Sequence, residues 1–146
     1  MVALGSGKSQ KEGPVSILLV EDNETDVKII LRAFDKAKLL SNVFVVADGF
    51  QALDFLKRQG RYEGRESKSP DIILLDINLP RMDGRQFMRE FRLLKEFNQI
   101  PVIVFTTKEG MEDIFKVEGA TDYVMKSLDA LDLIKKIRKH TQSRQH

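Results

Sequence analysis

Five side chains that could do chemistry each follow a short apolar run in this sequence. They are three carboxylates, one hydroxyl and one amine, at Glu21, Asp22, Asp76, Thr106 and Lys126. Short apolar runs predict buried strands, and in parallel sheets polar chemistry collects at the carboxyl ends of the strands. We therefore expect these side chains to meet at one edge of a sheet.

Carboxylates brought together at such an edge repel one another. At ~4 Å and an effective dielectric constant near 20, each pair costs about 4 kcal/mol. A hard divalent cation such as Mg²⁺, which prefers oxygen ligands, would offset that cost together with Lys126. A cation, an ammonium, a hydroxyl and a carboxylate nucleophile are the parts needed for phosphoryl transfer to an aspartate. Asp76 is the favoured nucleophile, because a carboxylate directly after four apolar residues is costly to bury without a partner.

Each of these residues taken singly has a simpler interpretation. Asp22 could be no more than a helix cap, Thr106 no more than a hydroxyl at the end of a strand, and Lys126 no more than a solvated surface residue. The functional hypothesis depends on their combination at successive strand ends.

The elements that must position these residues alternate between apolar runs and helical patterns. Strands are predicted over Val15–Val20, Val43–Ala47, Asp71–Asp76, Pro101–Phe105 and Thr121–Met125. The first helix is predicted after a cap at Asn23 or Thr25, with Val27, Ile30, Leu31 and Phe34 on one face, and the second after Asp48-Gly49, with Ala52, Leu53 and Leu56 on one face. A third helix is predicted over Gly84–Phe97 and a weak fourth one over Lys108–Glu118. The last is predicted over Leu128–His140, with Leu131, Ile134 and Ile137 on one face. Five β-α repeats predict an α/β fold, with a mostly parallel sheet covered by helices on both faces.

Length and composition narrow the class of protein further. The chain has 146 residues, and we expect a flexible tail over 1–13, one folded domain over 14–141 and a short tail over 142–146. Cysteine is absent and the net charge is only +2, which argues against disulfides, thiolate metal sites and nucleic-acid binding. No apolar run approaches the ~18–20 residues of a membrane span, and no secretory signal is recognisable, so the cytoplasm is the expected location.

Several segments resemble the receiver domain of bacterial response regulators, and the resemblance extends from about Val15 to Lys139. The matching segments are Leu18–Asn23, Asp71–Pro80, Met82–Gly84, Pro101–Thr106 and Gly119–Lys126. The stretch Asn78–Arg85 is most similar to stand-alone receivers that serve phytochrome-type and related histidine kinases. The resemblance implies a flavodoxin-like (βα)5 three-layer sandwich whose five-stranded parallel sheet has the order 2-1-3-4-5.

The resemblance also implies roles for individual residues. Asp76 would accept a phosphoryl group from a kinase histidine, and Lys126 and Thr106 would contact that group. Magnesium would be bound by Asp22, Asp76 and the backbone carbonyl of Asn78, with Glu21 holding a metal-bound water. Tyr123 would be the aromatic switch that follows the movement of Thr106. The side chains of Asn78 and Lys108 would tune the lifetime of the phosphoryl group.

The implied partners are proteins. A sensor histidine kinase or phosphotransfer protein would supply the phosphoryl group, and a downstream protein target would read the phosphorylated state of a monomer or homodimer. Only six residues follow the last predicted helix, so we expect no DNA-binding or enzymatic output domain, and no enzymatic activity beyond chemistry at Asp76 itself.

Two departures from the family pattern keep alternatives open. Ser127 replaces the usual proline after the lysine, which leaves open whether the Lys126–Ser127 bond is cis. Eleven residues separate Thr107 from Gly119, fewer than in the resembling sequences, so the fourth helix should be short, displaced or poorly ordered. Both departures motivate one alternative, a degenerate receiver that binds partners without phosphorylation. A second alternative, a magnesium phosphohydrolase, is disfavoured because Asn78 stands where such enzymes need an acid.

Overall fold

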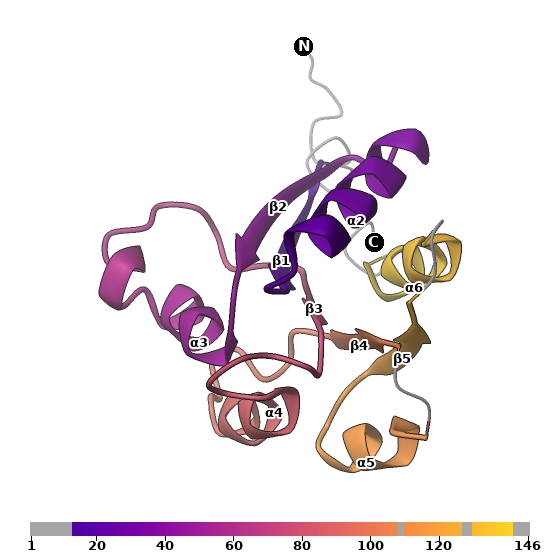
Figure 1. Ribbon diagram of the computed structural model, residues 1–146. Helices are drawn as coiled ribbons and strands as arrows, with labels where there is room; N and C mark the ends of the chain where they lie inside the picture. Colours follow the sequence, from indigo (N-terminus) through magenta and orange to yellow (C-terminus); the bar gives the residue numbers. More distant parts are fainter. Residues whose placement is uncertain (1–12, 108–109, 127–129, 142–146) are drawn as a thin grey trace.

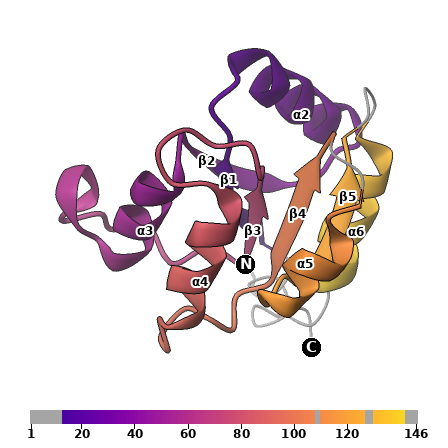
Figure 2. The ribbon, with the colours of Figure 1, turned by 60° about the horizontal axis from the view of Figure 1, so that its bottom comes forward.

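Five parallel strands form one sheet in the computed structural model, which describes residues 13–107, 110–126 and 130–141. The sheet order is β2-β1-β3-β4-β5, as the sequence resemblance implied. The strands are β1 (Val15–Val20), β2 (Ser41–Val46), β3 (Ile72–Leu75), β4 (Val102–Thr106) and β5 (Asp122–Met125). The arrowheads of β3 and β4 point the same way in Figure 2, so both strands deliver their following residues to one edge.

Helices cover both faces of the sheet (Figure 1). The helical elements are α2 (Glu24–Lys36), α3 (Gly49–Lys57), the short 3₁₀ turn η1 (Gly60–Tyr62), α4 (Gly84–Arg92), α5 (Glu112–Val117) and α6 (Leu131–Thr141). Helices α2 and α6 pack on one face, and α3, α4 and α5 pack on the other. The flavodoxin-like three-layer sandwich is therefore confirmed.

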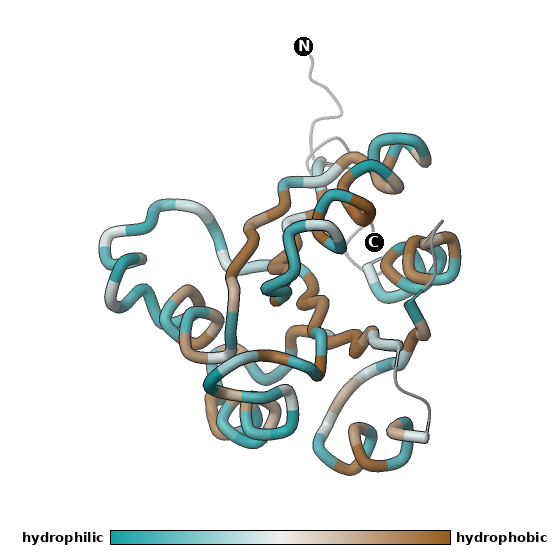
Figure 3. The backbone as a smooth tube through the Cα atoms, in the orientation of Figure 1, coloured by the Kyte–Doolittle hydropathy of each residue, from teal (hydrophilic) through white to brown (hydrophobic). Residues whose placement is uncertain are grey.

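Alternation of side chains along the strands divides the core into two clusters. In β3, Ile73 and Leu75 face the α3–α4–α5 layer, while Ile72 and Leu74 face α2 and α6. Strand β3 is apolar along its whole length, as Figure 3 shows, and β1 is apolar except at Ser16. Both strands are buried throughout, because a parallel strand in the middle of such a sheet is covered on both faces. Among the described residues, no helix has the length and apolar character needed to cross a bilayer.

Several predicted helix boundaries and faces were wrong. Helix α4 ends at Arg92 rather than at Phe97. The Asn98 side-chain amide donates a hydrogen bond to the Arg92 carbonyl at 3.0 Å and so caps this helix end. The apolar spacing continues through Leu94 because a tight turn, rather than further helix, directs that side chain toward the core. Leu31 and Leu131 are 38% and 55% exposed, so neither belongs to the buried face of its helix. Burial in a helix depends on where its neighbours lie, and the spacing of apolar residues does not encode that.

The short fourth helix was predicted correctly, since α5 spans only six residues. The predicted tails, apart from Gly13, lie outside the described residues, as do Lys108 and the Lys126–Ser127 bond.

Candidate functional site

The strand ends bring the predicted acidic side chains together. Strand β1 ends at Val20, so Glu21 and Asp22 lie in the connection to α2 and are not forced onto opposite faces of the sheet. Asp76 follows β3, and its backbone N–H donates to the Val20 carbonyl at 3.1 Å. Carboxylate oxygens of Glu21, Asp22 and Asp76 all lie within 4.8 Å of one another. We call these three residues the acidic cluster.

The acidic cluster has the donor chemistry of a magnesium site. Glu21 and Asp76 are only 2% and 4% exposed, whereas Asp22 is open to solvent. Mg²⁺ takes a few carboxylate oxygens and keeps several waters, which suits a cluster of two buried carboxylates and one exposed carboxylate. The crowding also affects protonation: burial, followed by the neighbouring Asp76 charge, raises the pKa of Glu21 to about 7 against the hydrogen bond from Lys126.

Asp76 is held by one contact on each carboxylate oxygen. Its Oδ1 accepts a hydrogen bond from the backbone N–H of Asn78 at 3.2 Å, and its Oδ2 lies 3.3 Å from the Lys126 ammonium. Ile77 and Leu79 are buried on either side of the exposed Asn78, which anchors the loop next to Asp76. This arrangement presents a fixed carboxylate beside the acidic cluster.

Lys126 joins the acidic cluster to helix α2. Its Nζ lies 2.8 Å from Glu21 Oε1 and 2.8 Å from Asp26 Oδ2, in addition to its contact with Asp76. Burial would by itself lower the pKa of Lys126, but the hydrogen bonds to Asp26 and Glu21 and the charge on Asp76 outweigh it and raise that pKa above its ordinary value. The ammonium therefore stays charged at physiological pH.

Asp26 was missed by the sequence analysis. The Asn23 side chain accepts the Asp26 N–H at 3.0 Å and starts α2, which places Asp26 in the first helical turn beside the site. A detectable signal existed, because Asp26 lies one helical turn beyond Asp22 and helix starts in this fold face the carboxyl edge of the sheet.

Thr106 and Tyr123 lie on the neighbouring strands β4 and β5, with Thr106 at the carboxyl edge of the sheet and Tyr123 opposite Val104. Thr106 is the last residue of β4 and is fully buried, and its carbonyl accepts the Lys126 backbone N–H at 2.8 Å. Tyr123 in β5 packs in the same core cluster as Phe115. Burial and the nearby Glu112 charge raise the pKa of the Tyr123 hydroxyl, so it remains a neutral hydrogen-bonding group.

A second ion pair that the sequence analysis missed ties two loops together near the site. Arg81 in the β3–α4 loop binds the buried carboxylate of Asp48, with its Nε 2.9 Å from Asp48 Oδ2. The other Asp48 oxygen caps α3 by accepting the Gln51 N–H at 2.8 Å. This contact fixes the loop that carries Asn78 against the start of α3.

The order of the parallel sheet places the structure in the class of flavodoxin-like α/β domains, and its acidic cluster, buried hydroxyl and lysine lie at the carboxyl edge of that sheet. Residues 17–138 match the response regulator receiver domain, and the chain belongs to this family of two-component signalling proteins.

Individual relatives are similar over most of the chain. Response regulator Rcp1 of Synechocystis sp. (strain ATCC 27184 / PCC 6803 / Kazusa) is 34% identical over 127 residues, which cover 86% of this chain and 85% of Rcp1. The crystal structure of the phosphorylated cyanobacterial phytochrome response regulator RcpA superposes with a TM-score of 0.77 at 34% identity, over 90% of this chain and 96% of RcpA. The receiver domain of a sensor histidine kinase of Pseudomonas aeruginosa PAO1, which holds a magnesium ion in its active-site cleft, has a TM-score of 0.73 at 28% identity, over 89% of this chain and 99% of that domain.

Proposed function

We propose that this chain is a phosphorylation-dependent signalling switch in which Asp76 accepts a phosphoryl group. The observation that carries the proposal is the setting of Asp76, a buried carboxylate held by a backbone N–H and an ammonium within the acidic cluster. The donor would be a phosphohistidine of a sensor histidine kinase or phosphotransfer protein. The likeness to RcpA supports a phytochrome-type kinase as the cognate donor.

In the proposed reaction, an Asp76 carboxylate oxygen attacks the phosphorus of the donor. A P–O bond forms as the P–N bond breaks, and its electron pair passes to the imidazole nitrogen, which takes up a proton. Lys126 and the Thr106 hydroxyl would donate hydrogen bonds to the phosphoryl oxygens. Asp22, Asp76 and the Asn78 carbonyl would hold magnesium, with Glu21 orienting a metal-bound water. When bound, the cation supplies neutralisation of charge on the phosphoryl oxygens.

The signal would leave the site through Thr106 and Tyr123. Thr106 is fully buried, so its movement toward a phosphoryl group would leave a space in the core. The neighbouring aromatic ring of Tyr123 would turn inward to fill that space. The change would be read by a protein partner or passed on by phosphorelay, and the domain that does this would extend over 14–141. We place this reaction in the cytoplasm.

Labelling with a small phosphodonor tests the proposal. Incubation with acetyl phosphate and magnesium should add the mass of one phosphoryl group, and Asp76→Asn should abolish the addition while the exposed-site control Asp35→Asn retains it. Equal labelling of Asp76→Asn and the parent would contradict the assignment of the nucleophile. Magnesium binding without labelling would favour the degenerate receiver, and rapid multiple-turnover phosphate release from phosphomonoesters would favour the phosphohydrolase.

A further inference from the structure

The Lys126 ammonium donates hydrogen bonds to three carboxylates at once. It lies 2.8 Å from Glu21, 2.8 Å from Asp26 and 3.3 Å from Asp76. A lysine ammonium has three N–H donors and no acceptor. A new hydrogen bond to a phosphoryl group on Asp76 therefore requires that one of these contacts be given up.

Asp26 is the partner that Lys126 can release with the smallest penalty. The Glu21 side chain is fully buried, so bulk water cannot replace the ammonium as its partner. The Asp26 side chain is 35% exposed, so water can replace the ammonium there. Asp76 is the site of phosphorylation, so the ammonium stays beside it when it leaves Asp26.

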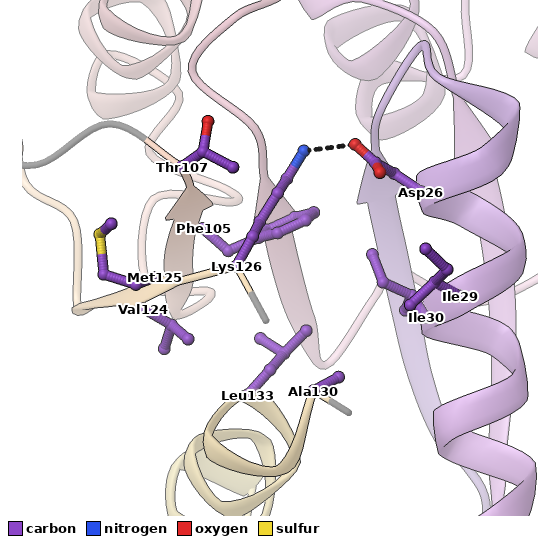
Figure 4. Close-up of a pocket in the computed structure, with 10 residues that line it drawn as sticks. All are labelled: Asp26, Ile29, Ile30, Phe105, Thr107, Val124, Met125, Lys126, Ala130 and Leu133. Carbon is purple, nitrogen blue, oxygen red and sulfur yellow. Dashed lines mark hydrogen bonds and ion pairs between the residues drawn. The ribbon is translucent and has the colours of Figure 1, made fainter. Parts of the chain in front are cut away.

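The surroundings leave room for this exchange. Figure 4 shows Lys126 reaching across the mouth of a cavity toward Asp26 on α2. The cavity has a volume of about 250 Å³ and a mainly apolar lining that includes Phe105 and Leu133. The ammonium lies 5.2 Å from the Phe105 ring centroid, so the aromatic face keeps an attractive surface beside it as it moves.

We propose that Asp26 is a positioning residue that holds Lys126 in the unphosphorylated protein and restrains phosphorylation of Asp76. The inference rests on the proposed role of Asp76 as phospho-acceptor. Asp26 holds the ammonium at 2.8 Å, whereas the contact with Asp76 is 3.3 Å, and the Asp26 carboxylate adds a negative charge where an anionic phosphodonor must approach. Removing Asp26 supplies Asp76 with a free donor and lowers the repulsion of the incoming group.

Substitutions at Asp26 test this role, with Glu24 as the matched control. Asp26→Asn should increase the initial rate of labelling by acetyl phosphate at saturating magnesium about fivefold, which corresponds to about 1 kcal/mol. Asp26→Glu, which keeps the carboxylate, should label at close to the parental rate. Glu24→Gln removes the same charge from the same helical turn and should also leave the rate close to the parental value.

A second readout is independent of phosphorylation. In ¹⁵N-labelled metal-free protein, the Lys126 ammonium hydrogens should exchange with water faster in Asp26→Asn than in the parent, and at the parental rate in Glu24→Gln. Failure of the parent to label would contradict the proposed function, and the hydrogen exchange would still report on the ion pair. Normal labelling of the parent with unchanged rates in Asp26→Asn would overturn the role of Asp26. Equal acceleration in Asp26→Asn and Glu24→Gln would overturn it too, because general charge would then explain the effect.

Discussion

Removing the Lys126 ammonium should destabilise the protein in the absence of magnesium. In Lys126→Met, the fully buried carboxylate of Glu21 loses a partner at 2.8 Å, and the buried Asp76 loses one at 3.3 Å. Breaking a buried pair typically costs about 3–5 kcal/mol. Glu21 limits the loss because its pKa is already about 7 and its carboxyl group can take up a proton. We therefore expect the free energy of unfolding to fall by about 2 kcal/mol at about pH 8, or roughly 4–8 °C in Tm.

The sign of the pH dependence follows from Glu21. Its pKa is raised in the folded state from 4.5 to about 7, so the folded state binds a proton more readily than the unfolded state and stability falls as pH rises through that interval. The loss in Lys126→Met should accordingly be larger at about pH 8 than at about pH 6. Magnesium should restore part of the lost stability, because a cation bound at the acidic cluster would neutralise the same carboxylates.

Urea unfolding followed by circular dichroism, with EDTA or with millimolar magnesium, measures these effects. The exposed-site control Lys135→Met should stay within about 0.5 kcal/mol of the parent under both conditions. If Lys126→Met unfolded at the parental urea midpoint in EDTA at about pH 8, the reasoning about the acidic cluster would be wrong.

Two further predictions concern positions outside the acidic cluster. Burial would raise the pKa of Asp122, but hydrogen bonds from His140 and a lysine of the same helix outweigh it and lower the pKa to about 2. The stabilisation from the ionised Asp122 carboxylate is present above about pH 4 and is lost as pH falls toward about 2. Asp122→Asn should therefore lower the unfolding free energy by about 1 kcal/mol at neutral pH and make stability in urea titrations depend less on pH in this acid range. An unchanged pH dependence would contradict this prediction. At Gly84 an added Cβ would lie 2.9 Å from the Ile77 backbone, so Gly84→Ala should cost about 1–3 kcal/mol and slow labelling by acetyl phosphate, unlike Gln86→Ala in the same helix; parental stability and labelling in Gly84→Ala would refute the clash.

The sequence alone determined the sheet and the position of the central carboxylate. The apolar runs and the helical patterns between them predicted five strands in a mostly parallel sheet, because a strand buried on both faces is apolar along nearly its whole length. The meeting of Glu21, Asp22 and Asp76 followed from the same argument, since parallel strands deliver their carboxyl ends to one edge. The short α5 followed from the length of its segment.

Only the tertiary structure decided which charged groups form ion pairs with one another. Lys126 and Asp26 are 100 positions apart, and Arg81 and Asp48 are 33 apart. Whether such groups meet depends on how α2 sits against β5 and how the β3–α4 loop folds over α3. The sequence pattern around a residue indicates which face of its own helix or strand it occupies. The energy of an ion pair depends instead on the distance between groups on different elements, and that distance is set only when the chain packs.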